Sequence, residues 1–286
     1  MSKVMVVTDS TANIPQELLD GYPIVSVPLQ VIWGNEIFRD GIDIQTKEFY
    51  ERLTSDKVLP STSQVTPEEF KTMYSQLIDE GYDILSMHIS SKLSGTLDSA
   101  IQAKKDFPNA KIELFDSFST SMAMGFQVLS TARMAAAGAT LAECKAVAEK
   151  SGHNTGIYFV VNTLEFLHRG GRIGGAQAFM GTMLNLKPIL ELRDGRIEAV
   201  ERVRTQSKAV DRLLDLVEEK IKNEPGPIRL CAVHANAPEE GHLLLEKAVK
   251  RFPASLVTDA VVSTVSPVIG THTGPGALGL AYMYSM

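Results

Sequence analysis

The stretch DILSMHISSKLSGT, from Asp83 to Thr96, contains the pattern that decides the fold. It begins as a buried β-strand, Asp83 to Ile89, and passes directly into a loop of serines, lysine and glycine before a helix that runs to Phe107. Strands that lead through polar residues into helices are the repeating units of α/β proteins. Because Val4 to Val7 and Lys111 to Phe115 are followed in the same way, we predict an α/β first domain with a doubly wound, mostly parallel sheet.

The second half of the chain has a different pattern. The segments Pro188 to Leu192 and Arg196 to Val203 resemble strands, and the dipeptide between them, Asp194-Gly195, is typical of a tight hairpin. Hairpins of this kind favour an α+β domain with a largely antiparallel sheet. We therefore expect two domains, residues 1–153 and residues 154–286.

Several local signals mark individual elements. Thr66 with Glu69, and Thr140 with Glu143, each have the spacing of a capping box at the start of a helix. The segment Gly270 to Gly276 is rich in glycine and predicts a rigid turn. The apolar segment Ala277 to Tyr284 is predicted to be a closing strand, with a helix as the alternative.

The stretch LEFLHRGGRIGGAQAFMGTMLNLKPIL, Leu164 to Leu190, has the highest local density of glycine. The pair Gly170-Gly171, followed by Arg172, indicates a chain reversal at which the backbone approaches another group closely. That group is either a ligand or a neighbouring helix. We expect a short helix before the glycines and a second helical segment that ends near Leu186.

Composition excludes several classes of function. Of the 286 residues, 44% are hydrophobic and 22% are charged, and the net charge is -6, so no basic field favours nucleic acid. No apolar run reaches the roughly 20 residues that a membrane span needs, and we expect a cytoplasmic protein. Cys144 and Cys231 are too distant for a redox pair and are predicted to be reduced core residues. The six histidines show no metal-ligand spacing, so we expect no metal site.

Hydroxyl-bearing loops recur where predicted strands end or helices begin. Asp9-Ser10 follows the first strand, Ser61 to Gln64 forms a polar loop before a helix, and Ser90 to Thr96 follows the strand described above. Ligands of α/β proteins collect at the carboxyl ends of parallel strands, and helix amino ends favour anions. The alternative for each serine or threonine is that it only caps a helix.

These loops suggest a binding site more directly than a catalytic one. The motifs for acyl hydrolysis, for a phosphate loop and for dinucleotide binding are absent from the sequence. Thr62, Ser94 and His272 could donate hydrogen bonds to a small anionic head group, with Arg204 as the counter-charge. The alternative is an acyl ester hydrolase or acyltransferase with Ser94 as the nucleophile and His272 as the base.

Seven motifs, in this order along the chain, resemble those of the DegV family. They are Asp9-Ser10, Ser61-Thr62-Ser63-Gln64, Ser91-Lys92-Leu93-Ser94-Gly95-Thr96, Gly170-Gly171-Arg172-Ile173-Gly174, Lys187-Pro188-Ile189-Leu190, Val203-Arg204-Thr205 and His272-Thr273-Gly274-Pro275-Gly276. The resemblance implies an α/β domain and an α+β domain with a long-chain fatty acid bound between them. It also implies the function of the bacterial FakB proteins. These are carriers that present the fatty acid carboxylate to an ATP-dependent kinase, which forms an acyl phosphate for phospholipid synthesis.

The same resemblance implies roles for individual residues. Thr62 and Ser94 would hold the carboxylate, and Arg204 and His272 would belong to the polar network around it. The neighbouring candidates are Ser63, Gly95, Thr96, Gly270 and Thr271. Candidates for the wall of the acyl tunnel are Met122, Met124, Phe179, Met180, Met183 and Leu184, for which ordinary core packing is the alternative. The chain departs from many relatives at Val65, where they have proline, and this affects the stiffness of the loop.

Taken together, the residues and the resemblance predict a fatty-acid carrier with no catalysis of its own and no cofactor. Its expected partners are the fatty acid and a fatty acid kinase, with transient contact with a membrane surface, and the carrier is expected to be a monomer. Arg169, Arg172 and Lys187 are candidates for the kinase-docking face, with packing or helix-end pairing as the alternative. A protein-interaction module remains a third hypothesis.

Overall fold

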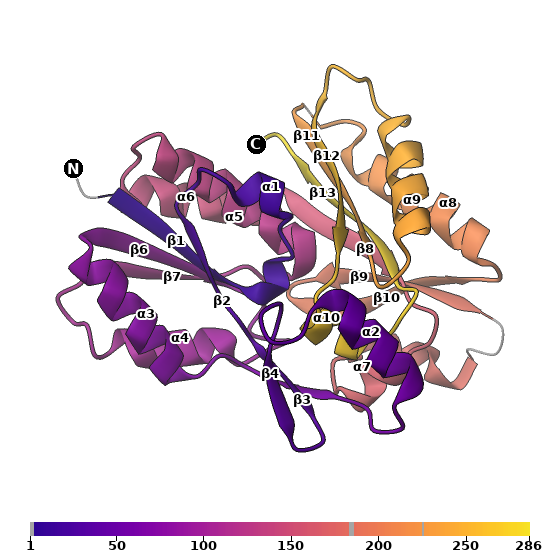
Figure 1. The fold of residues 1–286 in the computed structure, drawn as a ribbon. Helices are drawn as coiled ribbons and strands as arrows, with labels where there is room; N and C mark the ends of the chain where they lie inside the picture. Colours follow the sequence, from indigo (N-terminus) through magenta and orange to yellow (C-terminus); the bar gives the residue numbers. More distant parts are fainter. Residues whose placement is uncertain (1–2, 183–185, 225) are drawn as a thin grey trace.

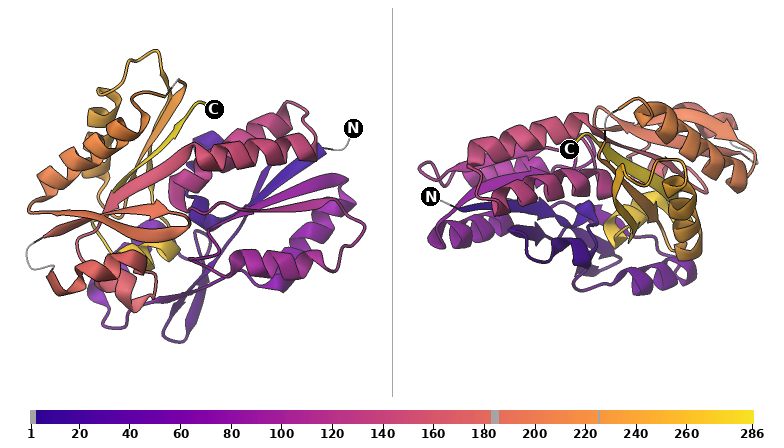
Figure 2. Two further views of the ribbon diagram at one scale, coloured as in Figure 1. Left: turned by 180° about the vertical axis from the view of Figure 1, so that it is seen from behind. Right: turned by 90° about the horizontal axis from the view of Figure 1, so that it is seen from above.

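Two large sheets and a small one form the protein (Figure 1). The computed structural model describes residues 3–182, 186–224 and 226–286. The views in Figure 2 show the first half of the chain and the second half side by side, with each large sheet in its own half. The predicted fold class, an α/β part joined to a part with a largely antiparallel sheet, is confirmed.

The first half contains an entirely parallel sheet. Its strand order is β2-β1-β6-β7, and the strands are β1 (Lys3–Asp9), β2 (Ile24–Val27), β6 (Tyr82–His88) and β7 (Ile112–Asp116). Helices cover both faces, as expected for a doubly wound sheet (Figure 1). On one face lie α3 (Pro67–Asp79) and α4 (Thr96–Lys104), and on the other lie α5 (Ser121–Ala136) and α6 (Leu141–His153). The turn η1 (Ser10–Ala12) and the short helix α1 (Gln16–Leu19) follow β1.

The second large sheet is antiparallel except between β11 and β12. Its order is β10-β9-β8-β13-β11-β12. The strands are β8 (Thr155–Val160), β9 (Lys187–Arg193), β10 (Arg196–Val203), β11 (Ile228–His234), β12 (Val257–Thr264) and β13 (Leu278–Tyr284). Helices α8 (Gln206–Ile221) and α9 (Pro238–Val249) cover the outer face, and α5 of the first half contacts β8 and β13. The boundary expected between residues 153 and 154 precedes β8 and stays a prediction.

The hairpin and strand predictions for this sheet are confirmed. Asp194-Gly195 joins β9 to β10 with φ angles of 50° and 80°. The tip of this hairpin reaches the first half of the chain, where the buried Ser90 Oγ donates a hydrogen bond of 2.8 Å to the Gly195 carbonyl. The segment from Ala277 to Tyr284 contains the strand β13, so the helix alternative is wrong.

A small third sheet corrects two predictions. It consists of β3 (Gln30–Trp33), β4 (Glu36–Arg39) and β5 (Ser61–Ser63) in the order β4-β3-β5. The sequence alone predicts one extended segment from Ile24 to Trp33, whereas the structure divides it between β2 of the parallel sheet and β3 of the small sheet. Ser61–Ser63 is a strand rather than a loop, because Val31 of β3 pairs with Thr62 and fixes its position.

The region around His272 is also different from the prediction. The glycine-rich segment that begins at Gly270 is mostly helical: α10 spans Pro267–Thr273, and the chain reverses only at Gly274, where φ is 70°. Pro267 at the first turn and Gly274 at the end explain this, since proline suits a helix start and glycine suits its termination. α10 packs against α2 (Thr46–Ser55), so His272 is held on a helix rather than on a loop.

The glycine-rich stretch forms α7 (Glu165–Arg169), a turn, and the 3-10 helix η2 (Gly174–Thr182). A second helical segment ending near Leu186 was predicted, but its 3-10 geometry was not. The predicted part at residues 183–185 lies outside the described residues. The glycines approach protein groups. A Cβ at Gly174 would lie 2.3 Å from the Ile197 carbonyl oxygen of β10, and one at Gly170 would lie 2.0 Å from His272 Nδ1.

Other local predictions are confirmed. Both capping boxes are present, at Thr66 and at Thr140. Cys144 and Cys231 are free and buried. A search of the described part of the chain found no helix with the length and apolarity that crossing a membrane requires.

Candidate functional site

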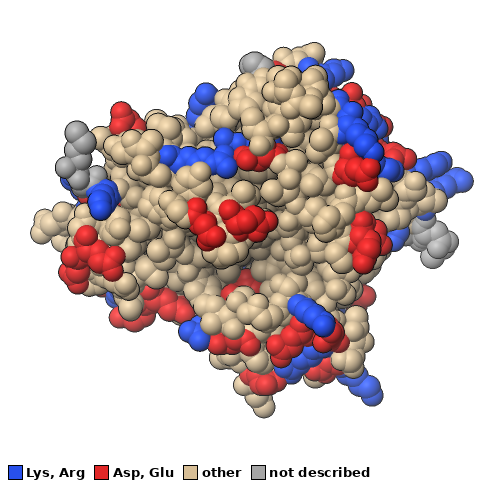
Figure 3. Space-filling view, turned by 45° about the horizontal axis from the view of Figure 1, so that its top comes forward, with Lys and Arg blue, Asp and Glu red and all other residues tan. Residues whose placement is uncertain are grey.

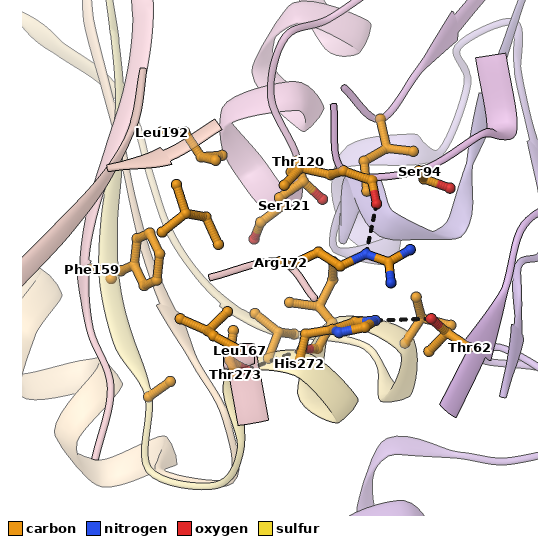
Figure 4. A pocket seen from close by; sticks show the side chains of 18 of the residues that line it. Thr62, Ser94, Thr120, Ser121, Phe159, Leu167, Arg172, Leu192, His272 and Thr273 are labelled. Atoms are coloured by element: carbon orange, nitrogen blue, oxygen red, sulfur yellow. Dashed lines mark hydrogen bonds between the residues drawn. The ribbon is translucent and has the colours of Figure 1, made fainter. Parts of the chain in front are cut away.

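A cavity of about 260 Å³ lies where the polar loops of the first half meet the inner face of the antiparallel sheet (Figure 4). One group of lining residues is polar: Thr62, Ser63, Gln64, Ser94, Thr120, Ser121, Arg172, His272 and Thr273. The other group is apolar or glycine: Leu29, Ile89, Leu93, Ile157, Phe159, Leu167, Leu192, Ile197, Val233, Val265, Val268, Ile269, Ala277, Leu278 and Gly279. Largely apolar walls with a few convergent polar groups are typical of small-molecule sites.

The antiparallel sheet supplies the apolar floor of this cavity. Val233, Gly279 and Phe159 are direct neighbours across β11, β13 and β8, so they share one face of the sheet. A Cβ at Gly279 would lie 2.8 Å from Val233 Cγ2 and 3.0 Å from Phe159 Cβ. Glycine therefore leaves open the space between two larger side chains.

Thr62 and His272 form one polar contact at the other end of the cavity. Thr62 Oγ1 and His272 Nε2 are hydrogen-bonded at 2.9 Å, and they come from β5 and from the last turn of α10. Burial, together with the charge of Arg172, lowers the pKa of His272 to about 4. The imidazole is therefore neutral near neutral pH, and its Nδ1 packs against Gly170.

Ser94 lies on the loop between β6 and α4. Its Oγ is 2.9 Å from the Thr96 Oγ1, and it also accepts a hydrogen bond from the Thr96 amide. Gly95 packs against Gln64, whose Oε1 would be 2.1 Å from a Cβ at that position. This close approach places the Ser94 loop directly beside the Thr62 strand, so both predicted hydroxyls line one cavity.

Arg172 supplies the positive charge in the cavity wall. Its Nε donates to the Leu93 carbonyl at 2.9 Å, and its Nη1 donates to the Gly170 carbonyl at 2.6 Å. Arg172 was a candidate for the kinase-docking face, with packing as the alternative, and the turn after Gly171, where φ is 71°, directs its side chain toward the Ser94 loop. One sequence signal could have indicated this position of Arg172. The residue directly follows the pair Gly170-Gly171, of which Gly170 packs against His272.

Several predicted residues lie away from the cavity. Arg204 is exposed just after β10, and Met180 is 40% exposed. Phe179 packs beneath the Arg202 guanidinium at 4.8 Å, because η2 turns its aromatic ring toward β10 rather than toward the cavity. Met122 and Met124 are fully buried in the hydrophobic core, so core packing accounts for both.

The other predicted site residues that the structure describes lie in or next to the cavity, or support residues that line it. Ser63 lines the cavity beside Thr62. Thr96 supports Ser94, Gly270 packs against Tyr50, and the Thr271 hydroxyl donates to the Pro267 carbonyl within α10. Met183 and Leu184 lie outside the described residues. Gln64, Thr120 and Ser121 also line the cavity, although they were not predicted as site residues.

A buried hydrogen-bond network supports the strand ends beside the cavity. The carboxylate of Asp9 accepts from the Ile89 amide at 2.9 Å and contacts His88 Nδ1 at 3.0 Å. The network continues from His88 Nε2 to Ser86 and from there to the Tyr74 hydroxyl. Asp9, one of the candidate site residues, is thus fully buried and structural.

Ser10, the other candidate after the first strand, also has a structural position. Its hydroxyl donates to Asp40 at 2.7 Å and accepts from the Leu29 amide at 3.1 Å. Asp40 in turn accepts from the Val268 amide at the start of α10. Burial raises the pKa of Asp40 above its ordinary value. This chain of contacts connects the end of β1 to the helix that carries His272.

The surface shows mixed charges on the face in Figure 3, where basic and acidic side chains are interspersed.

Within residues 3–182, 186–224 and 226–286, no three or more His, Cys, Asp or Glu side chains form a group that could hold a metal ion. The polar groups at the cavity are therefore hydroxyls, an amide, a neutral imidazole and one guanidinium. Such a set suits an anionic or hydrogen-bonding head group.

Comparison with known proteins identifies the class of protein that this fold and cavity define. The profile of the DegV family, described as an uncharacterised protein family, matches residues 3–285. The chain belongs to the DegV family, which confirms the resemblance seen in the sequence.

Individual relatives match almost the whole chain, and two solved ones are described by fatty acid binding. A DegV domain-containing protein of Streptomyces coelicolor is 39% identical over 278 residues, 97% of each chain. A solved DegV family structure from Thermus thermophilus, described by its fatty acid binding, is 35% identical with a TM-score of 0.92 and covers 99% of this chain and 100% of that one. The solved structure of DegV from Bacillus subtilis, described as a fatty acid binding protein, is 34% identical with a TM-score of 0.88 and covers both chains fully, 100% of each.

Proposed function

We propose that this protein binds a long-chain fatty acid, with the carboxylate at Thr62 and Ser94 and the alkyl chain on the apolar floor. One observation carries the proposal: a single cavity connects a cluster of polar side chains to the apolar face of a sheet. Solved relatives that are described as fatty-acid-binding support it. DegV family membership supports this class of ligand, and the separation of polar and apolar walls in the cavity supports this orientation.

The apolar chain provides most of the binding free energy. Burying roughly 16 methylenes at about 0.8 kcal/mol each is on the order of 13 kcal/mol before the costs of association. The head group therefore does not need a bidentate arginine. Hydroxyl donors hold it weakly enough for a later reaction at the same carboxylate.

In this proposal Arg172 provides the counter-charge that the sequence reasoning gave to Arg204. Arg172 lines the cavity beside His272 and the Ser94 loop, whereas Arg204 is exposed. The neutral His272 orients the Thr62 hydroxyl through their hydrogen bond.

We further propose that the protein is a cytoplasmic, monomeric carrier that presents the carboxylate to an ATP-dependent kinase, which forms the acyl phosphate for phospholipid synthesis. Family resemblance motivates this role. The hydrogen bonds favour a carrier over the hydrolase alternative, because Ser94 pairs with Thr96 while His272 pairs with Thr62.

Arg169 and Lys187 are the remaining candidates from the predicted docking face. Arg169 forms an exposed ion pair with Glu165, and Lys187 donates to Asn162.

Lipid analysis tests the binding proposal directly. Solvent extraction of the purified protein followed by mass spectrometry should recover a long-chain fatty acid, and oleate or palmitate should bind in titration. Thr62→Val and Ser94→Ala should each weaken binding about 5- to 10-fold, since each removes one hydrogen bond to the carboxylate. Ser91→Ala, on the exposed part of the same loop, is the control and should bind normally.

Two results would contradict this proposal. The first is a protein that contains no fatty acid and binds none after incubation. The second is turnover of acyl esters that disappears in Ser94→Ala, which would favour the hydrolase.

A further inference from the structure

The hydroxyl of Ser121 is a polar group in the cavity wall that the proposed head-group site does not use. Ser121 lines the cavity and is only 3% exposed. Its Oγ is buried and has no hydrogen-bond partner among the described protein groups. Figure 4 shows Ser121 on the cavity wall between Leu192 and Arg172. Buried hydroxyls are normally hydrogen-bonded, so this one indicates a ligand group.

The backbone at Ser121 adds a second, independent feature. Ser121 is the first residue of α5, a helix of 16 residues, and its φ is 53°, an unusual angle for a residue other than glycine. Thr120 precedes it without capping the helix, because the Thr120 hydroxyl donates to the Thr11 carbonyl instead. The first amides of a helix lack partners within the helix and carry the positive end of its dipole. An acceptor oxygen beside Ser121 is therefore favoured.

Tight packing fixes this helix end in place. A Cβ at Gly125, one turn along α5, would lie 2.8 Å from the Ala12 carbonyl oxygen, so the helix sits directly against η1. α5 also contacts β8 of the other sheet. The Ser121 hydroxyl consequently cannot leave the wall by a small shift of the helix.

We propose that Ser121 and the amino end of α5 form a second polar subsite, which binds an oxygen atom carried on the acyl chain. The ligand class is an oxygenated fatty acid, with a hydroxyl or keto group along the chain. This inference rests on the proposed fatty-acid function. An unsubstituted chain leaves the Ser121 hydroxyl buried without a partner, whereas an oxygen on the chain accepts a hydrogen bond from it.

The test compares stearate with a series of hydroxystearates in which the hydroxyl moves stepwise along the chain. At least one isomer should bind the protein about 5- to 10-fold more tightly than stearate does, the value of one hydrogen bond to a buried hydroxyl. Ser121→Ala should abolish this preference and leave the affinity for stearate unchanged or higher. Ser121→Gly, which tolerates the positive φ, should do the same without the risk of backbone strain. Ser119→Ala, in the same segment and outside the cavity lining, is the control.

The outcomes separate this inference from the proposed function. If the protein binds none of the acids, the fatty-acid proposal fails and the subsite has no ligand. If it binds stearate but prefers no isomer, or keeps the preference in both Ser121 variants, only the second subsite is refuted. If Ser121→Ala weakens stearate as much as the hydroxystearates, the site holds the carboxylate and the proposal is wrong.

Discussion

The two large sheets contribute to the cavity in different ways. The parallel sheet contributes the loops that follow its strands, including the loop with Ser94 after β6. The antiparallel sheet contributes a face, from which Phe159, Val233 and Gly279 form the floor. Parallel strands place polar loops at one edge, whereas a sheet face presents alternate side chains as an apolar surface. The polar end and the apolar end can therefore be changed separately.

The largest effect should come from removing the buried carboxylate that holds the strand ends. Asp9→Ala leaves the His88 ring, the Ile89 amide and the Thr11 hydroxyl without their acceptor. We expect the free energy of unfolding to fall by about 3–5 kcal/mol in urea denaturation, the usual cost of breaking a buried polar network. Asp20→Ala, at an exposed position, should change it little. A loss below about 1 kcal/mol for Asp9→Ala would mean that the loops do not depend on this network.

A smaller effect concerns pH and tests the neutral imidazole at the polar end. The pKa of His272 is about 4 in the folded protein, below its ordinary value, so the unfolded chain binds the proton more readily. The contribution of His272 to stability is therefore full above about pH 6.5 and is lost as the pH falls toward 4. When the pH is lowered from neutral to about 5, the free energy of unfolding of the wild type should fall by about 2 kcal/mol more than that of His272→Asn. Equal losses in the two proteins would show that His272 is not buried in its neutral form.

The smallest of these effects tests the floor without touching the polar end. Gly279→Leu places a side chain between Val233 and Phe159, where a Cβ already approaches within 3.0 Å of both neighbours. Fatty-acid affinity should fall about 10-fold, because the alkyl chain loses part of its space. Adding the second substitution Val233→Ala should restore part of the lost affinity in the double variant. If Gly279→Leu folds and binds normally, this floor does not hold the chain.

The fold could be predicted from sequence wherever the signal is local. The capping boxes at Thr66 and Thr140, the Asp194-Gly195 turn and the alternation of strand and helix depend on neighbouring residues, and all were found. The strand β5 was missed because its identity depends on pairing with β3, a contact between distant segments. The helix α10 was missed because Gly270, Gly274 and Gly276 together favour a turn, whereas Pro267 starts a helix, Gly274 ends it, and packing against α2 holds it.

The site residues, like the fold, could be predicted only where the sequence signal is local. Thr62, Ser94 and His272 were predicted as site residues because each lies in a distinctive motif, and the structure brings them to one cavity. Arg172 was not predicted to line the cavity, because no sequence pattern states which way a side chain leaves a glycine turn. Ser121 was missed since serine at a helix start is ordinarily a cap. Its special position follows from the backbone angle and from burial, which the sequence does not contain.

The hydrogen bond between Thr62 and His272 joins residues 210 positions apart in the chain. Contacts of such long sequence separation close only after the intervening segments are ordered, so this pair belongs to the late steps of folding. A partly synthesised or truncated chain that lacks α10 has the Thr62 strand but not its partner. A ligand that requires both residues therefore recognises only the completed protein, and its binding adds to the stability of that state alone.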